Sequence, residues 1–213
     1  DNASETDLTY EGRVGALDIH KTITVIVVPV YGGRIAETAL ERMKDIHGYD
    51  SPAVPVVVYG NRDYDDALLE LRDWCNEHGF VPVAAAAFIG EHSYSRPDRP
   101  IAAHRPDEDD LQKALQFGQQ IRNNLLGMND LNTLGELKVK GGFPYKVKGP
   151  KTPQAPVTLV DLCTRCGFCI EICPVQAIRL EEEIVSDPES CIKCCACVKQ
   201  CPSHCLLYTS DAA

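Results

Sequence analysis

Two matched runs of cysteine near the C-terminus constrain this chain more than any other feature. They occupy residues 163–174 and 191–202, and both follow one rule, C-x2-C-x2-C-x3-C-P. Thiolates are soft metal ligands, and three cysteines spaced three apart let a short loop wrap one face of a cubane of iron and sulfide. The fourth ligand must come from elsewhere. The pattern therefore predicts iron–sulfur chemistry.

Both runs resemble the ligand runs of bacterial ferredoxins that carry two 4Fe-4S clusters. In that family the cysteine before the proline ligates the other cluster. By this resemblance one cluster is held by Cys163, Cys166, Cys169 and Cys201. The other is held by Cys191, Cys194, Cys197 and Cys173. The exchange ties the two halves together and implies clusters close enough to pass an electron between them.

Two other uses of cysteine fit the sequence less well. Zinc is satisfied by paired C-x2-C knuckles and has no use for a third cysteine followed by C-P. A disulfide framework is disfavoured because eleven cysteines is an odd number and only Cys75 precedes the two runs. Cys75 lies beside Trp74 in a helical pattern, which indicates a small buried hydrophobe. Cys195, in the place of Gly167, and Cys205 receive no ligand role.

Composition narrows the class of protein. The 213 residues are 44% apolar, without an apolar run long enough to span a membrane, so we expect a soluble protein with no membrane insertion. The net charge of -10 argues against nucleic-acid binding and favours an acidic carrier that meets basic patches on redox partner proteins. Metal-binding cysteines without an export signal favour the cytoplasm. The oligomeric state is left open.

The segment 1–130 alternates strand and helix patterns, which predicts an α/β fold with a parallel sheet. The first strand, at residues 22–30, is β-branched throughout, as expected of a strand covered on both faces. The predicted order is strand 22–30, helix 35–46 with Gly48 as its stop, strand 54–59, helix 67–78 closed by Gly79, strand 81–89, a long loop at 90–106, and a helix that begins at Asp107.

Residues 29–34 and 59–68 resemble the loops after the third and fourth strands of flavodoxin-like domains. Residues 8–205 as a whole resemble bacterial proteins that fuse a flavodoxin-like domain to a two-cluster ferredoxin. The resemblance implies that these loops flank FMN, at the carboxyl ends of the strands. The implied flavin-facing residues are Tyr31, Gly32, Gly33, Asn61, Arg62 and Tyr64. The alternative is that they are ordinary loop formers and core caps.

One departure from flavodoxins concerns the first strand. Flavodoxins hold the FMN phosphate in a loop after that strand, and this chain has neither that loop nor an apolar strand before residue 22. In the strand order 2-1-3-4-5 the first strand lies between the second and third. We therefore expect a flavodoxin-like sheet that lacks its first strand, a central gap, and a chain truncated at its N-terminus.

These patterns predict a domain organisation. The predicted parts are a truncated flavodoxin-like domain at 1–130, a Gly/Pro/Lys-rich linker at 131–157, a small α+β bacterial-type ferredoxin domain at 158–207, and a tail at 208–213. The lysines of the linker dock an acidic partner, fold back onto the acidic body or belong to a solvated tether, and we favour the tether.

The predicted function is electron transfer on two 4Fe-4S clusters, with exchange of electrons with FMN in an intact flavodoxin-like domain. The alternatives are a flavin-dependent iron–sulfur oxidoreductase with a small substrate and a flavin-free docking module. No catalytic residue is assigned, because the sequence lacks Ser-His-Asp, zinc-protease and phosphate-loop patterns. Whether the protein is an enzyme is therefore left open.

Overall fold

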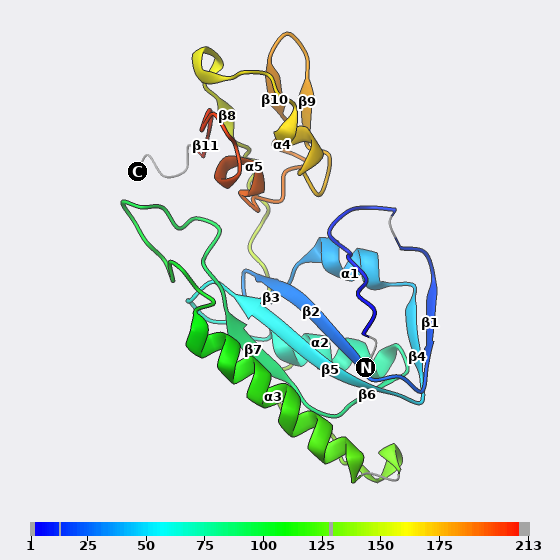
Figure 1. The fold of residues 1–213 in the computed structure, drawn as a ribbon. Helices are drawn as coiled ribbons and strands as arrows, with labels where there is room; N and C mark the ends of the chain where they lie inside the picture. The colour runs from blue at the N-terminus through cyan, green and yellow to red at the C-terminus, as the bar shows by residue number, and fades with distance from the viewer. Residues whose placement is uncertain (1–2, 13, 128–129, 209–213) are drawn as a thin grey trace. The chain divides into compact units, whose positions relative to one another are not determined.

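The computed structural model describes residues 3–12, 14–127 and 130–208, which divide into two compact units (Figure 1). Most of the first unit is Val14–Lys148, and most of the second lies from Gly149 onward. Within the described residues, no helix combines the length and the apolar character needed to cross a membrane.

A five-stranded sheet forms the centre of the first unit (Figure 1). Its strands are β2 (Thr24–Tyr31), β3 (Arg34–Ile35), β5 (Ser51–Tyr59), β6 (Phe80–Pro82) and β7 (Ala86–Ile89). The order is β3-β2-β5-β6, and β7 pairs with a later part of β5 than β6 does. The strands β2, β6 and β7 run parallel to β5, whereas β3 returns antiparallel to β2. A separate parallel pair joins β1 (Leu17–His20) to β4 (Ile46–Tyr49).

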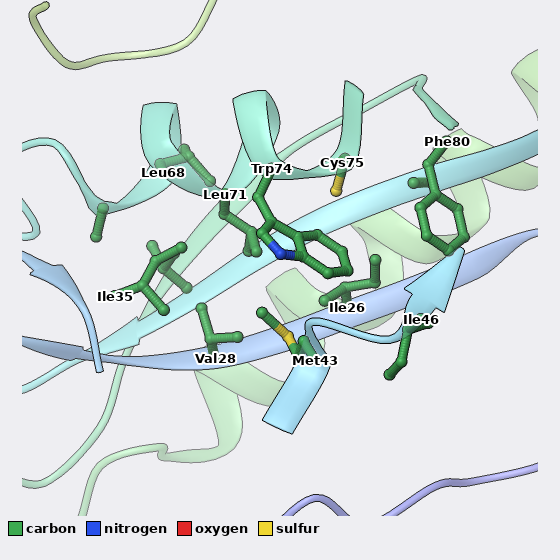
Figure 2. Packing of buried hydrophobic residues seen from close by; sticks show 13 residues of the cluster. Ile26, Val28, Ile35, Met43, Ile46, Leu68, Leu71, Trp74, Cys75 and Phe80 are labelled. Carbon is green, nitrogen blue, oxygen red and sulfur yellow. The ribbon is translucent and has the colours of Figure 1, made fainter. Parts of the chain in front are cut away.

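Helices cover both faces of this sheet. On one face, α1 (Glu37–Met43) and α2 (Ala67–Glu77) enclose the main core. Figure 2 shows Leu71 and Trp74 of α2 directed toward Ile26 and Val28 of β2. On the other face, Ile121 of α3 (Glu108–Leu126) packs against the valines of β5. The unit is therefore a mixed α/β structure of three layers.

Several predicted elements are confirmed. Both α2, followed by Gly79 with a φ of 78°, and α3, capped by Asp107, lie where the helical patterns placed them. Cys75 is fully buried in the main core, and burial raises the pKa of its thiol to about 12. It is the buried hydrophobe that its position beside Trp74 predicted.

Three predictions about the elements were wrong. Gly48 lies inside β4 and does not end a helix, because α1 already ends at Met43. The strand predicted at 81–89 is divided into β6 and β7. The strand β2 is not covered on both faces: Ile26 and Val28 are buried, but the exposed fractions of Val25 and Val27 are 59% and 57%. The packing of α3 reaches β5 and leaves this side of β2 open.

By the flavodoxin resemblance β2 and β5 correspond to the third and fourth strands, so the missing first strand would lie beside β2 on the side away from β5. Residues Thr24–Pro29 of β2 pair directly with Ala53–Val58 of β5, so these two strands are neighbours. On the other side of β2, β3 pairs only with Val30 and Tyr31. Within the described residues, any space for a further strand therefore lies at the outer edge of β2. The central gap stays a prediction.

Residues 136–148, here called the lysine strap, fold against the first unit. Lys140 forms an ion pair of 2.7 Å with Asp63, and Lys146 one of 2.6 Å with Asp65. The backbone N–H groups of Gly142 and Lys146 donate to the carboxylate of Asp66 at 2.8 and 2.6 Å. Tyr145 donates to Asp73 at 2.5 Å, and the Lys148 amine donates to the carbonyl of Ile35 at 2.9 Å. These contacts match the alternative in which lysines fold back onto the acidic body, so the solvated tether was wrong for this segment.

The second unit is built from short elements. They are β8 (Val157–Thr158), a 3-10 turn (Val160–Leu162), α4 (Phe168–Glu171), β9 (Ile178–Leu180), β10 (Ile184–Ser186), α5 (Ala196–Lys199) and β11 (Leu206–Leu207). The strands form two antiparallel pairs, β8 with β11 and β9 with β10. Tyr208, predicted as the start of a tail, is buried within this unit, and the rest of that tail lies outside the described residues.

Candidate functional site

The two cysteine runs have the same backbone. When Cys163 is aligned with Cys191, the start of α4 falls on the start of α5, and three pairs of residues with left-handed backbone angles coincide. These pairs are Arg165 and Lys193 (φ 55° and 60°), Gly167 and Cys195 (79° and 58°), and Gln176 and His204 (53° and 47°). Such angles are rare for residues other than glycine, so their repetition shows that both loops make the same turns.

Each antiparallel strand pair joins a strand from one half of the repeat to a strand from the other half. Ser186 pairs with Ile178 in one antiparallel pair, and Thr158 pairs with Leu206 in the other. In the alignment that places Cys163 on Cys191, Thr158 falls on Ser186 and Ile178 falls on Leu206. One pair therefore joins the two ends of the unit and the other joins its middle. This arrangement ties the two halves of the unit together.

The cysteines form the centre of the second unit's core. Cys169, Cys173, Cys197 and Cys201 are buried together with Ala177, Ile178, Ile184 and Leu206. Cys163, Cys191 and Cys194 are half-buried, and Cys166 is exposed. All eight are free thiols. Thiols at the centre of a small core can serve as ligands without exposing their cluster fully to water.

The first cysteine set comprises Cys163, Cys166, Cys169 and Cys201. Burial raises the pKa of Cys169, and the charges of Cys166, Cys201 and Cys163 raise it further. Cys169 therefore lies within electrostatic range of the three other members, although Cys201 belongs to the other run. The grouping of these four cysteines as ligands of one cluster stays a prediction.

The second cysteine set comprises Cys173, Cys191, Cys194 and Cys197. All four line one cavity of about 20 Å³, whose wall is apolar. Burial raises the pKa of Cys197 to about 12, and Cys194, Cys173 and Cys191 contribute to the rise. The four donors suit a 4Fe-4S cluster, since it needs four thiolates in an apolar surround.

Backbone N–H groups already point at several of these sulfurs. Ala177 donates to the sulfur of Cys173 at 3.2 Å, and at the matching place in the second run Cys205 donates to the sulfur of Cys201 at 3.5 Å. Lys193 donates to the sulfur of Cys191 at 3.4 Å. Such contacts stabilise thiolate charge and are one of the levers by which a protein sets a cluster's potential. Within the described residues, no group of His, Cys, Asp or Glu side chains is arranged to hold a single metal ion.

The two cysteines without a predicted role also lie in this core. Cys195 is buried, lines the cavity of the second set and has the left-handed angle that Gly167 has in the first run. Cys205 is buried at the position of Ala177, with its sulfur 3.4 Å from that of Cys201. Sequence analysis left both unassigned. The constant offset between the two runs is the signal that could have placed them.

The flavin candidates are only partly gathered. Gly32, Gly33 and Arg62 line a pocket of about 60 Å³ at the carboxyl ends of β2 and β5. Its other lining residues are Val30, Tyr59, Gly60, Asp63 and His92, of which none was predicted. The remaining candidates, Tyr31, Asn61 and Tyr64, are not in that lining.

The geometry of these candidates does not fit a flavin. Tyr64 packs against the main core, and its ring lies under the amine of Lys140 at 4.8 Å. Gly33 faces Asp65 so closely that a Cβ there would lie 2.1 Å from the carboxylate. Ligand pockets usually measure about 300 Å³ or more, and the sequence supplies no phosphate-binding loop for this one. The six residues stay a prediction.

Comparison with known proteins identifies the second unit. Residues 155–202 match the sequence profile of the 4Fe-4S dicluster domain. Searches of curated proteins and of solved structures found no match to this chain.

The match and the cysteine core together define a ferredoxin-like iron–sulfur domain. Such a domain binds at least one 4Fe-4S cluster, and its chemistry is that of iron–sulfur electron transfer. The thiols of the second unit fit that group, because Cys169, Cys173, Cys197 and Cys201 are buried in one core and Cys163 and Cys191 pack against it.

Proposed function

We propose that this protein is an electron carrier that holds two 4Fe-4S clusters and moves single electrons between redox partner proteins. The first cysteine set holds one cluster and the second set holds the other. The observation that carries the proposal is the repeat of the backbone, which gives both runs the same loop and helix. Two equal loops with equal donors are expected to hold equal clusters.

The exchange of ligands has separate support. Cys201 is an electrostatic neighbour of Cys169, and Cys173 lines the same cavity as Cys191. Each set therefore draws its fourth member from the other run. When bound, a cluster supplies the one-electron redox step. The protein supplies thiolates, N–H donors to sulfur and an apolar surround that excludes water.

The proposal is tested by the iron content and spectrum of protein purified without oxygen. We expect about eight irons and eight sulfides per chain, with a broad visible absorption that dithionite bleaches. About four irons would support a single cluster, and zinc in place of iron would contradict the proposal.

Pairs of substitutions test the exchange of ligands. Cys173→Ala with Cys191→Ala removes two ligands of one cluster, so about four irons should remain. Cys173→Ala with Cys163→Ala removes one ligand from each cluster, so both should be lost. If the clusters are not exchanged, the two results are reversed. Cys75→Ala is the matched control, because Cys75 lies in the first unit and should leave the iron content unchanged.

Exchange with FMN in a flavodoxin-like first unit, and the related flavin-dependent reductase, are tested by adding FMN. Quenching of flavin fluorescence with one FMN bound per chain would support both functions. The substitution Arg62→Ala should then weaken the binding of FMN. The pocket at Gly32 and Arg62, of about 60 Å³, is too small for a flavin. The cluster proposal is independent of this result.

One of the predicted domain boundaries, the start of the linker, is changed in the proposal. The lysine strap is bonded to the first unit, so we propose that the connection between the units begins at Gly149 and not at residue 131. Cytoplasmic location and the identity of the redox partners stay predictions.

A further inference from the structure

A buried hydroxyl lies at the cavity of the second cysteine set. Ser186 ends β10 and lines the cavity together with Cys173, Cys191, Cys194 and Cys197. Its Oγ is buried and has no hydrogen-bond partner among the residues that the structure describes. A buried hydroxyl without a partner is costly, so such a group usually marks a place where something else binds.

The same position in the other half of the repeat is different. Thr158 is the residue that corresponds to Ser186, and its hydroxyl donates to the carbonyl of Ile184 at 2.7 Å. The hydroxyl of Thr158 is therefore occupied by backbone. The hydroxyl of Ser186 is free to serve the cavity. The two halves of the repeat have equivalent ligands but differ in the hydrogen bonding of this hydroxyl.

We propose that the Ser186 hydroxyl donates a hydrogen bond to a sulfur of the cluster held by the second cysteine set. This inference rests on the proposed function, because it needs a cluster at that set. The donor makes this cluster easier to reduce than the one held by the first set. Reduction adds one negative charge to the cluster, and a hydrogen bond to sulfur stabilises the reduced form more than the oxidised form.

This difference in potential determines which cluster is reduced first. When both clusters are oxidised, the first electron settles on the cluster beside Ser186. The cluster of the first set is then reduced second, at a lower potential. The protein thus distinguishes its two clusters by a side chain outside both cysteine runs.

Redox titration of the cluster-loaded protein, followed by electron paramagnetic resonance, tests this inference. Ser186→Ala should lower the reduction equilibrium constant of one cluster about tenfold, which is about 59 mV for one electron. The other cluster should keep its potential. Ser186→Thr keeps a hydroxyl at this position and should keep the wild-type potential. Thr158→Val is the matched control and should shift neither potential.

A second readout is taken on the wild-type protein and compared with Ser186→Ala. In wild-type protein exchanged into deuterium oxide, the more easily reduced cluster should show a coupled deuteron beyond those of the backbone amides, and Ser186→Ala should lose it. Full iron content with unchanged potentials would overturn the role of Ser186 alone. In that case the Ser186 hydroxyl would donate to the carbonyl of Pro156, as the Thr158 hydroxyl donates to the carbonyl of Ile184. An iron content of about four in the wild type would overturn the second cluster and this inference together.

Discussion

The sulfur of Cys205 lies 3.4 Å from the sulfur of Cys201. The backbone N–H of Cys205 also donates to that sulfur, at 3.5 Å. In the first half of the repeat the equivalent residue is Ala177, which makes the same N–H contact with Cys173 but carries no thiol. A proposed ligand of one cluster therefore has a second thiol against it, and its counterpart does not.

This contact predicts how the protein is damaged when iron is lost. After removal of iron with a chelator and oxidation with diamide, we expect a disulfide between Cys201 and Cys205. The two thiols give up two electrons and two protons to the oxidant. Peptide mass spectrometry without reduction checks the bond. The control is Cys205→Ala, which should keep both clusters, because Ala177 serves in the other half. A disulfide mainly at Cys173 would contradict the prediction.

Substitutions at Cys195 test the requirement for a left-handed backbone. Cys195→Gly should keep the wild-type iron content, because Gly167 has this conformation in the first run. Its free energy of unfolding should change by less than about 1 kcal/mol, since relief of backbone strain offsets the loss of buried surface.

The matched comparison is Cys195→Val. A β-branched side chain is disfavoured at a φ of 58°, so this variant should lose iron and be less stable. Iron analysis and thermal unfolding measure both effects. Equal iron content in the two variants would show that the loop does not need this conformation.

The ion pair of Arg34 and Glu70 predicts a large effect on the first unit. The Glu70 carboxylate is largely buried and accepts from Arg34 Nε at 2.8 Å and from the Ile35 N–H at 2.9 Å. Glu70→Ala leaves these donors without a partner and should lower the free energy of unfolding by about 3 kcal/mol.

Urea unfolding followed by tryptophan fluorescence measures this change. The chain has one tryptophan, Trp74, which lies in the core of the first unit. The control is Glu41→Ala, whose exposed pair with Lys44 should contribute little. A similar decrease in the free energy of unfolding in both variants would show that the burial of Glu70 does not cause the large effect.

Acid should weaken the start of α3. The Arg105 guanidinium lowers the pKa of Asp110 to about 2, and Asp110 also belongs to the capping box with Asp107. The pKa is lower in the folded protein than in the unfolded chain. The stabilisation is therefore present above about pH 4 and is lost as the pH falls toward 2.

The stability of Asp110→Asn should accordingly depend less on pH across this range than that of the wild type. Urea unfolding at several pH values, followed by Trp74 fluorescence, checks the difference. Asp109→Asn serves as the control at the same turn. An unchanged pH dependence in Asp110→Asn would contradict the role of the Arg105 pair.

The sequence predicted those parts of the fold that local patterns determine. The stripe of Leu68, Leu71 and Trp74 located α2, and Asp107 located the start of α3. Local patterns did not show that Gly48 belongs to a strand, because β4 is set by its pairing with β1. They also overstated the covering of β2, since apolar composition does not say which helix packs where.

For the candidate site, spacing alone indicated the iron–sulfur class, and the profile match at 155–202 supports it. The flavin loops were inferred from resemblance, and tertiary contacts put Tyr64 against the core instead of at the pocket. The special position of Ser186 was beyond sequence analysis. A serine in a short strand has no pattern, and only its place at the cavity sets it apart from Thr158.

The lysine strap changes the mechanics of the chain between the two units. The Lys148 amine donates a hydrogen bond to the carbonyl of Ile35 in the first unit. Within the second unit, the Tyr208 hydroxyl donates one to the carbonyl of Gln154. The intervening segment is at most about 20 Å long when fully extended. A free linker from residue 131 would be several times longer. The volume that a cluster-bearing unit sweeps in search of a partner grows steeply with tether length, and the strap restricts it. Two of the strap's contacts are lysine ion pairs, so high ionic strength would weaken these contacts and lengthen this reach.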